Sequence, residues 1–96
     1  MRKLEIINKV SSQTGIDKTD VQETIEATLI TIKEALKDGE SVFIRGFGSF
    51  TNKKRARKIA RNISTNTAII LEAHYVPHFK PSKILVDIVK ENNKIV

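Results

Sequence analysis

The first part of the chain has apolar residues at helical spacing. The pattern predicts one helix over 3–14 and a second from about residue 18 to about residue 38, separated by a stop at Gly15 and an N-cap at Asp17. The apolar stripe of the second helix alternates three- and four-residue steps, as expected for a helix with one buried face. Its members are Val21, Ile25, Leu29, Ile32 and Leu36.

After Gly39 the pattern changes to that of strands. Residues 41–45 and 49–51 read as strand on either side of Gly46-Phe47-Gly48, where glycine permits a tight turn or a close backbone approach. Beyond residue 52 the pattern predicts a two-stranded β-ribbon around a polar tip at 64–67, with Pro77 ending its second strand. Pro81 and Ser82 then open a last helix.

This order, α-α-β-β-β-α, predicts an α+β fold in a single domain over residues 1–96. We expect a helical body at 1–39 and 80–92, a sheet and β-arm at 41–77, and a tail at 93–96. With 96 residues, of which a large part reaches outward, little chain is left for a core, which favours a two-fold dimer.

Composition narrows the class of protein. The chain has no cysteine, so disulfides and cysteine-ligated zinc are excluded. It shows no secretory signal and no apolar segment of about 20 residues, so we expect a cytoplasmic protein with no membrane partner.

The charge is concentrated in one third of the chain. Residues 41–71 hold seven Lys or Arg and no acid, whereas the net charge of the whole chain is +6. Six of these basic residues fall between 53 and 61: Lys53, Lys54, Arg55, Arg57, Lys58 and Arg61. Lysines that guard an edge strand against aggregation explain one or two of them. The density of the rest predicts binding to a polyanion, namely nucleic acid.

Two other interpretations of the sequence are weaker. A helix-turn-helix reader is disfavoured because residues 17–38 carry six acids and three lysines, a balance that repels phosphates. A metal or catalytic site is disfavoured because the only histidines, His74 and His78, flank Pro77 in a strand-like segment. We therefore expect no enzyme activity, no metal, no cofactor and no small-molecule substrate.

Ile63 is an apolar residue expected close to the end of the ribbon, far from any core. Single exposed apolar residues are common on protein surfaces. The alternative is a wedge that enters a base-pair step from the minor groove and kinks the duplex. The position alone does not choose between these interpretations.

Three segments together resemble the HU/IHF family of bacterial histone-like DNA-bending proteins: Gly46-Phe47-Gly48-Ser49-Phe50, the basic run with Arg61-Asn62, and Val76-Pro77-His78-Phe79-Lys80-Pro81. The resemblance covers about residues 1–90. It implies an intertwined dimer with a helical base and two protruding antiparallel β-ribbon arms, which bend double-stranded DNA through its minor groove and organise the bacterial nucleoid. Arg-Asn-Ile-Ser at 61–64 is similar to the branch of Bacteroidetes-like bacteria.

The resemblance also assigns roles to residues. It implies an aromatic dimer core of Phe47, Phe50 and Phe79. It implies DNA contacts on the body and at the base of the arm from Lys3, Gly46, Lys80 and Lys83. On the arm, it adds Asn62 and the wedge Ile63 to the basic residues named above.

The sequence departs from the family pattern at the tip of the arm. Ile63 stands where most members have proline, so the fixed φ of proline is absent. Asn66-Thr67 replaces a common Gly-Glu pair, which makes the arm more positive, and Ser82 replaces a usual glycine.

Three functions are consistent with these residues and with the resemblance. The first is a homodimer that bends DNA with little sequence specificity, and the second is a site-specific bender that forms one half of a heterodimer. The third is a structural RNA-binding protein, which is disfavoured because the minor groove of A-form RNA is wide and shallow.

Overall fold

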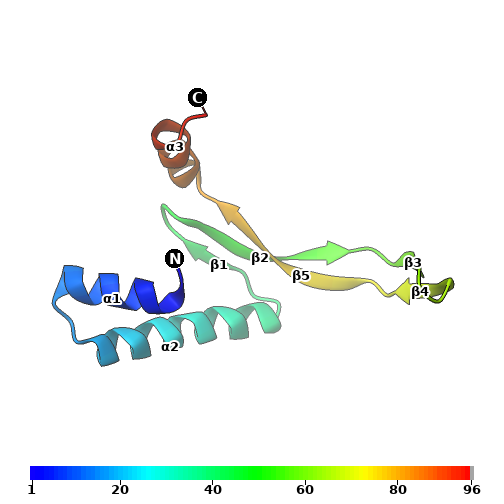
Figure 1. The fold of residues 1–96 in the computed structure, drawn as a ribbon, viewed down its shortest axis with the longest axis horizontal. Helices are drawn as coiled ribbons and strands as arrows, with labels where there is room; N and C mark the ends of the chain where they lie inside the picture. Colours follow the sequence, from blue (N-terminus) through cyan, green and yellow to red (C-terminus); the bar gives the residue numbers. More distant parts are fainter. Residues whose placement is uncertain (96) are drawn as a thin grey trace. The chain divides into compact units, whose positions relative to one another are not determined.

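The computed structural model describes residues 1–95. The chain forms two compact units, Met1–Ala35 and Leu36–Val96. The element order is α1, α2, β1–β5 and α3, so the fold is α+β as predicted (Figure 1). Of the expected tail, Val96 lies outside the described residues.

The first unit is built from α1 (Lys3–Thr14) and most of α2 (Lys18–Lys37). Gly15 ends α1 in the left-handed conformation at φ 74°, and its N–H donates to Ser11 O at 2.9 Å. The Asp17 carboxylate accepts from the Thr19 N–H at 3.2 Å and so satisfies a free donor in the first turn of α2. The predicted first and last residues of both helices are confirmed within one residue.

Buried apolar side chains are few. Among the described residues they are Ile7, 3% exposed, and Val21, 4% exposed, and both belong to the first unit. The second unit leaves large apolar side chains at its surface, including Phe43 and Ile84. A chain with so little buried apolar surface is marginal by itself, which fits the predicted need for a partner.

The second unit contains a three-stranded antiparallel sheet in the order β1-β2-β5. Its strands are β1 (Val42–Ile44), β2 (Gly48–Arg55) and β5 (His74–Pro81). The amide of Asn52 on β2 donates to Leu36 O at 2.8 Å, which satisfies a carbonyl in the last turn of α2.

The two glycines around Phe47 have different roles. Gly46 has φ 78° and makes the turn between β1 and β2. Gly48 allows a close approach instead, because a Cβ there would lie 2.6 Å from both Lys80 O and Phe79 Cε1. The sequence allowed either a tight turn or a close backbone approach here. Gly46 makes the turn, and Gly48 allows the close approach.

The ribbon is interrupted, which the sequence did not predict. The β2–β5 ladder ends at Arg55 opposite His74, and a separate ladder of β3 (Lys58–Asn62) and β4 (Thr67–Leu71) begins at Lys58 opposite Leu71. Two residues on each strand are unpaired between them, and the register is unchanged across the break. We call residues 53–76 the arm; Figure 1 shows the two ladders following one another along it.

Two expectations about prolines were wrong. Pro77 does not end its strand: it lies inside β5 opposite Asn52. Because β5 is an edge strand of its sheet, a residue without an N–H can be accommodated there. Pro81 is the last residue of β5 and not part of the last helix, so the helical body begins later than residue 80.

The last helix, α3 (Lys83–Asn92), is capped as expected by Ser82. The Ser82 hydroxyl accepts from the Leu85 N–H at 3.1 Å. The Ser82 N–H donates to Phe47 O at 2.9 Å, which fixes the start of α3 beside the β1–β2 turn.

Candidate nucleic-acid interface

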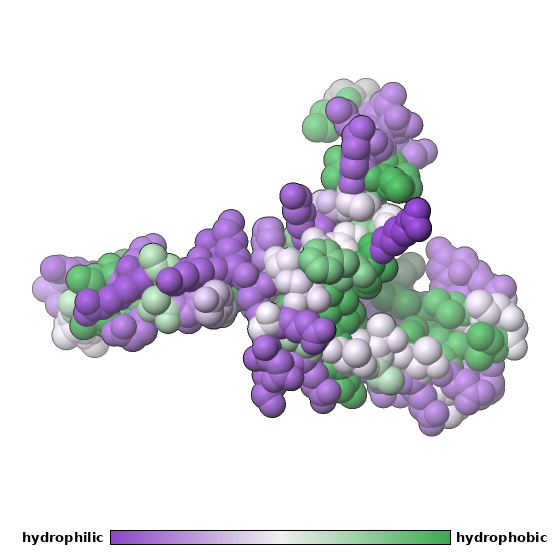
Figure 2. Space-filling model, turned by 180° about the vertical axis from the view of Figure 1, so that it is seen from behind, coloured by the Kyte–Doolittle hydropathy of each residue, from purple (hydrophilic) through white to green (hydrophobic). Residues whose placement is uncertain are grey.

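Four basic residues of the arm lie opposite non-ionic side chains across the ladders, and Arg55 lies opposite His74. Lys53 lies opposite Val76, Lys54 opposite Tyr75, Lys58 opposite Leu71 and Arg61 opposite Ala68. Neighbouring residues on a strand point to opposite faces, so Lys53 and Lys54 place positive charge on both sides of the ribbon. Figure 2 shows hydrophilic and hydrophobic side chains mixed over the surface of the arm, at the left of that view.

Arg57 is the exception among these residues. It lies in the break between the ladders, with its Nε 3.8 Å from Oε1 of Glu72. Glu72 is the single acid of the arm, and both side chains are largely exposed. The pair therefore lowers the local positive charge at the middle of the arm.

The tip is a four-residue loop, 63–66, closed by the pair Asn62–Thr67. Ile63 is the first residue of this loop and is 94% exposed. The loop therefore begins at Ile63 itself, one residue earlier than the tip predicted at 64–67. The side chain has the exposure that a wedge requires.

A second basic cluster forms around the β1–β2 turn and the start of α3. Gly46, Lys80 and Lys83 line one surface cavity of about 600 Å³. Arg45 lines the same cavity, so the cluster has three cations beside the capped N-terminus of α3. Free backbone N–H groups and positive charge together suit a phosphate oxygen. Arg45 was not among the predicted contacts, although its place next to Gly46 in the sequence could have indicated it.

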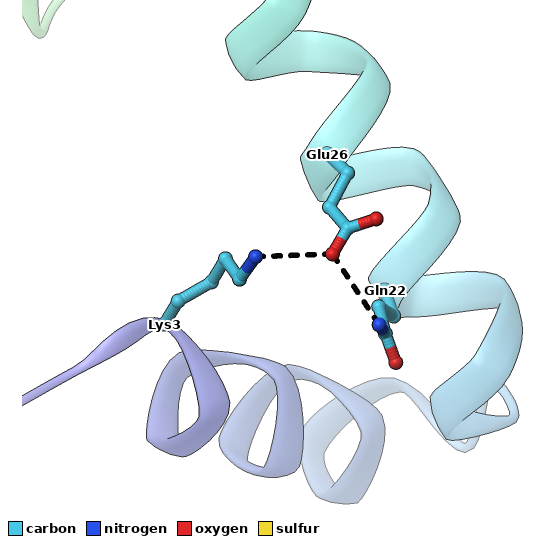
Figure 3. Close-up of polar contacts among 3 residues, drawn as sticks. All are labelled: Lys3, Gln22 and Glu26. Carbon is cyan, nitrogen blue, oxygen red and sulfur yellow. Dashed lines mark hydrogen bonds and ion pairs between the residues drawn. The ribbon is translucent and has the colours of Figure 1, made fainter.

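Lys3 belongs to the first unit and already has a partner there. Its Nζ lies 3.0 Å from Oε1 of Glu26, which also accepts from the Gln22 amide at 3.3 Å (Figure 3). The hydrogen bond from Lys3, then that from Gln22, and the charge of Lys3 hold the pKa of the Glu26 carboxyl below its ordinary value. Since an ammonium group has three N–H donors, a phosphate that binds Lys3 would share this lysine with the Glu26 carboxylate.

The three phenylalanines predicted as a core are in contact within one chain. The ring centroid of Phe79 lies 5.3 Å from that of Phe47 and 4.9 Å from that of Phe50, with tilted planes. Phe47 and Phe79 remain partly exposed. The cluster is therefore assembled but incompletely covered in the single chain.

The histidines do not approach one another. His74 and His78 lie four residues apart on β5, roughly 13 Å along a strand, which is too far for one metal ion. Among residues 1–95 no group of three or more His, Asp or Glu is placed to hold a metal. Every helix within residues 1–95 is too short or too polar to span a lipid bilayer.

Comparison with known proteins gives the family. The model of the family described as "Bacterial DNA-binding protein" matches residues 1–90. The chain belongs to this family.

Members of two kinds are similar to the chain at nearly equal identity. The "SPbeta prophage-derived DNA-binding protein HU 2" of Bacillus subtilis is 43% identical over 94% of this chain and 98% of its own length. "Integration host factor subunit beta" of a Marinomonas species is 42% identical over 99% of this chain and 96% of its own length. The family predicted from the sequence is confirmed, while sequence identity does not separate HU from integration host factor.

A solved structure supports the fold. The HU of an Anabaena HU–DNA cocrystal structure superposes with a TM-score of 0.89 at 32% identity, covering 94% of this chain and 98% of that one. The α+β fold with its β-ribbon arm is thus also that of an HU protein. The chain is a DNA-binding architectural protein of the HU/IHF type.

Proposed function

We propose that the chain acts as a homodimer that binds double-stranded DNA with its arms in the minor groove and bends it, with Ile63 as the wedge. The observation that carries this proposal is the 94% exposure of Ile63 at the tip of a ribbon that carries six basic residues and, between residues 53 and 76, a single acid. An apolar side chain at the end of a positive arm can enter a base-pair step once the phosphates are neutralised.

The contacts divide into two groups. On the arm, seven residues are proposed to contact phosphates and groove edges: Lys53, Lys54, Arg55, Arg57, Lys58, Arg61 and Asn62. On the body, the cavity lined by Gly46, Lys80 and Lys83, together with Arg45, is proposed to hold phosphates of flanking DNA. Lys3 adds a further contact from the first unit, and both units then form one DNA-binding domain.

The dimer is proposed to complete the core. A second chain would cover the partly exposed Phe47 and Phe79 and the exposed apolar side chains of α3, such as Ile84. No catalytic step, cofactor or small molecule takes part in this function. The protein is proposed to work on the nucleoid DNA of a bacterial cytoplasm.

The test is energy transfer between dyes at the two ends of a duplex. Bending brings the ends together, so the wild type should raise the transfer, and Ile63→Asp should lose most of this rise because burying a charge in the base stack is costly. Ile63→Leu is the matched control and should bend DNA. Bending that is unchanged in Ile63→Asp would overturn the wedge.

A site-specific bender in a heterodimer is the second candidate, favoured by the 42% identity to an integration host factor subunit. Titration of random against defined duplexes separates the two, because a site-specific protein prefers its site by about a thousandfold or more. Tighter binding to duplex RNA than to duplex DNA would overturn both.

A further inference from the structure

The loop at the tip of the arm is held by its own side chains. The Asn62 Oδ1 accepts two hydrogen bonds from Ser64, one from its N–H at 3.1 Å and one from its hydroxyl at 2.8 Å. On the other side of the loop, Arg61 Nη1 donates to Asn66 Oδ1 at 3.1 Å. Asn66 has φ 54°, a conformation that asparagine tolerates better than most residues.

The bonds between Asn62 and Ser64 enclose Ile63. A side-chain oxygen that accepts from the N–H two residues later forms an Asx-turn, which imitates a backbone turn and restricts the residue between. The residue between is Ile63, whose own side chain stays 94% exposed. The turn therefore restrains the backbone of the wedge without covering its side chain.

We infer that Asn62 and Ser64 are positioning residues that pre-organise Ile63 for insertion, a role that proline would fill through its fixed φ. This inference rests on the proposed function, since it needs Ile63 to be the wedge. A free isoleucine in a flexible loop must be ordered each time it inserts, and pre-ordering removes that cost from binding. The second hydrogen bond, from the Ser64 hydroxyl, holds the acceptor in place.

The structure also allows proline at position 63 as a rescue. Asn62 belongs to β3, and an extended residue is the one favoured before proline. Among the described residues other than glycine, only Asn66 has a positive φ, so the sign of φ at Ile63 is the one proline requires. Ile63→Pro should therefore keep the wedge while making the Asx-turn dispensable.

The experiment measures affinity and energy transfer on two duplexes, one intact and one with a short single-stranded gap that bends without insertion. Ser64→Ala keeps the N–H bond of the Asx-turn but loses the hydroxyl bond that holds its acceptor. It should weaken binding to the intact duplex about fivefold, the factor of one net hydrogen bond, and leave binding to the gapped duplex unchanged. Thr65→Val is the matched control, because it removes the hydroxyl that pairs with Thr67 at 2.7 Å in the same loop but does not touch the Asx-turn. It should leave both duplexes unaffected.

The decisive comparison is made in the Ile63→Pro background. There, adding Ser64→Ala should change neither affinity nor energy transfer, whereas a merely structural role of Ser64 would give the same loss with Ile63 or proline. An equal loss in both backgrounds, or no loss with Ile63, would overturn the inference while leaving the bending function intact. A wild type that binds the intact duplex without raising energy transfer would overturn the proposed function and this inference together.

Discussion

The Nε atom of Arg57 lies 3.8 Å from Oε1 of Glu72, across the break between the two ladders of the arm. Glu72 is the only acid of residues 53–76. The one ion pair found on the arm among the described residues thus lies at the point where its strands are not paired. The availability of Arg57 to a phosphate therefore depends on this single carboxylate.

Glu72→Gln should therefore strengthen DNA binding. Releasing Arg57 from an exposed ion pair should tighten binding about twofold to fivefold. If Arg57 then binds a phosphate, the slope of log K against log salt should steepen by about 0.9 for that phosphate. Glu91→Gln, the same chemical change on α3, is the control for net charge. Equal affinities of Glu72→Gln and wild type would show that the pair does not limit Arg57.

Arg55→Ala and Arg61→Ala should each weaken binding to all DNA sequences by a similar factor. Each phosphate that the protein no longer neutralises should lower the salt slope by about 0.9. Filter binding or fluorescence anisotropy over a range of salt concentrations measures both quantities. Lys33→Ala removes one positive charge from α2, and its slope should remain that of the wild type. Unchanged slopes in both arginine variants would mean that the arm is not the contact surface.

Glu26 gives a prediction about pH. Its carboxyl pKa is lowered in the folded protein, chiefly by the hydrogen bond from Lys3, so the folded state favours the ionised form. The resulting stabilisation is present above the pKa of the unfolded carboxyl and is lost as pH falls through the folded pKa. Urea unfolding should therefore show the wild type more stable than Glu26→Gln at neutral pH. The two proteins should converge in acid, and a difference that stays constant as the pH is lowered through the folded pKa would contradict this origin.

Gly48→Ala tests the close approach of β2 to β5. A Cβ would lie 2.6 Å from Lys80 O, a backbone atom that cannot move without disturbing the ladder. We expect a loss of about 1–3 kcal/mol in the free energy of unfolding. Gly39→Ala is the comparison, since nothing lies within 4 Å of its Cβ but its φ is 80°, so strain alone should cost about 1 kcal/mol. Equal stability of Gly48→Ala and wild type would mean that β5 can shift.

Local patterns in the sequence determined the helices and the charge of the arm. Apolar spacing, Gly15 and Asp17 placed α1 and α2 within one residue, because helix periodicity and capping depend on neighbours a few positions away. The six basic residues between 53 and 61 indicated the arm, because the charges of a segment can be counted from its sequence. The family motifs added the fold and the DNA-binding function.

Only the tertiary structure decided what depends on pairing between distant residues. Cross-strand register brought Arg57 to Glu72, left a break in the ribbon and placed Pro77 on an edge strand where its missing N–H is tolerated. Packing of α1 against α2 joined Lys3 to Glu26, and the turn after β3 put Ile63 inside the loop. These relationships depend on which residues pair across helices and strands, so no periodic pattern along the chain specifies them, although each changes what a predicted DNA contact can do.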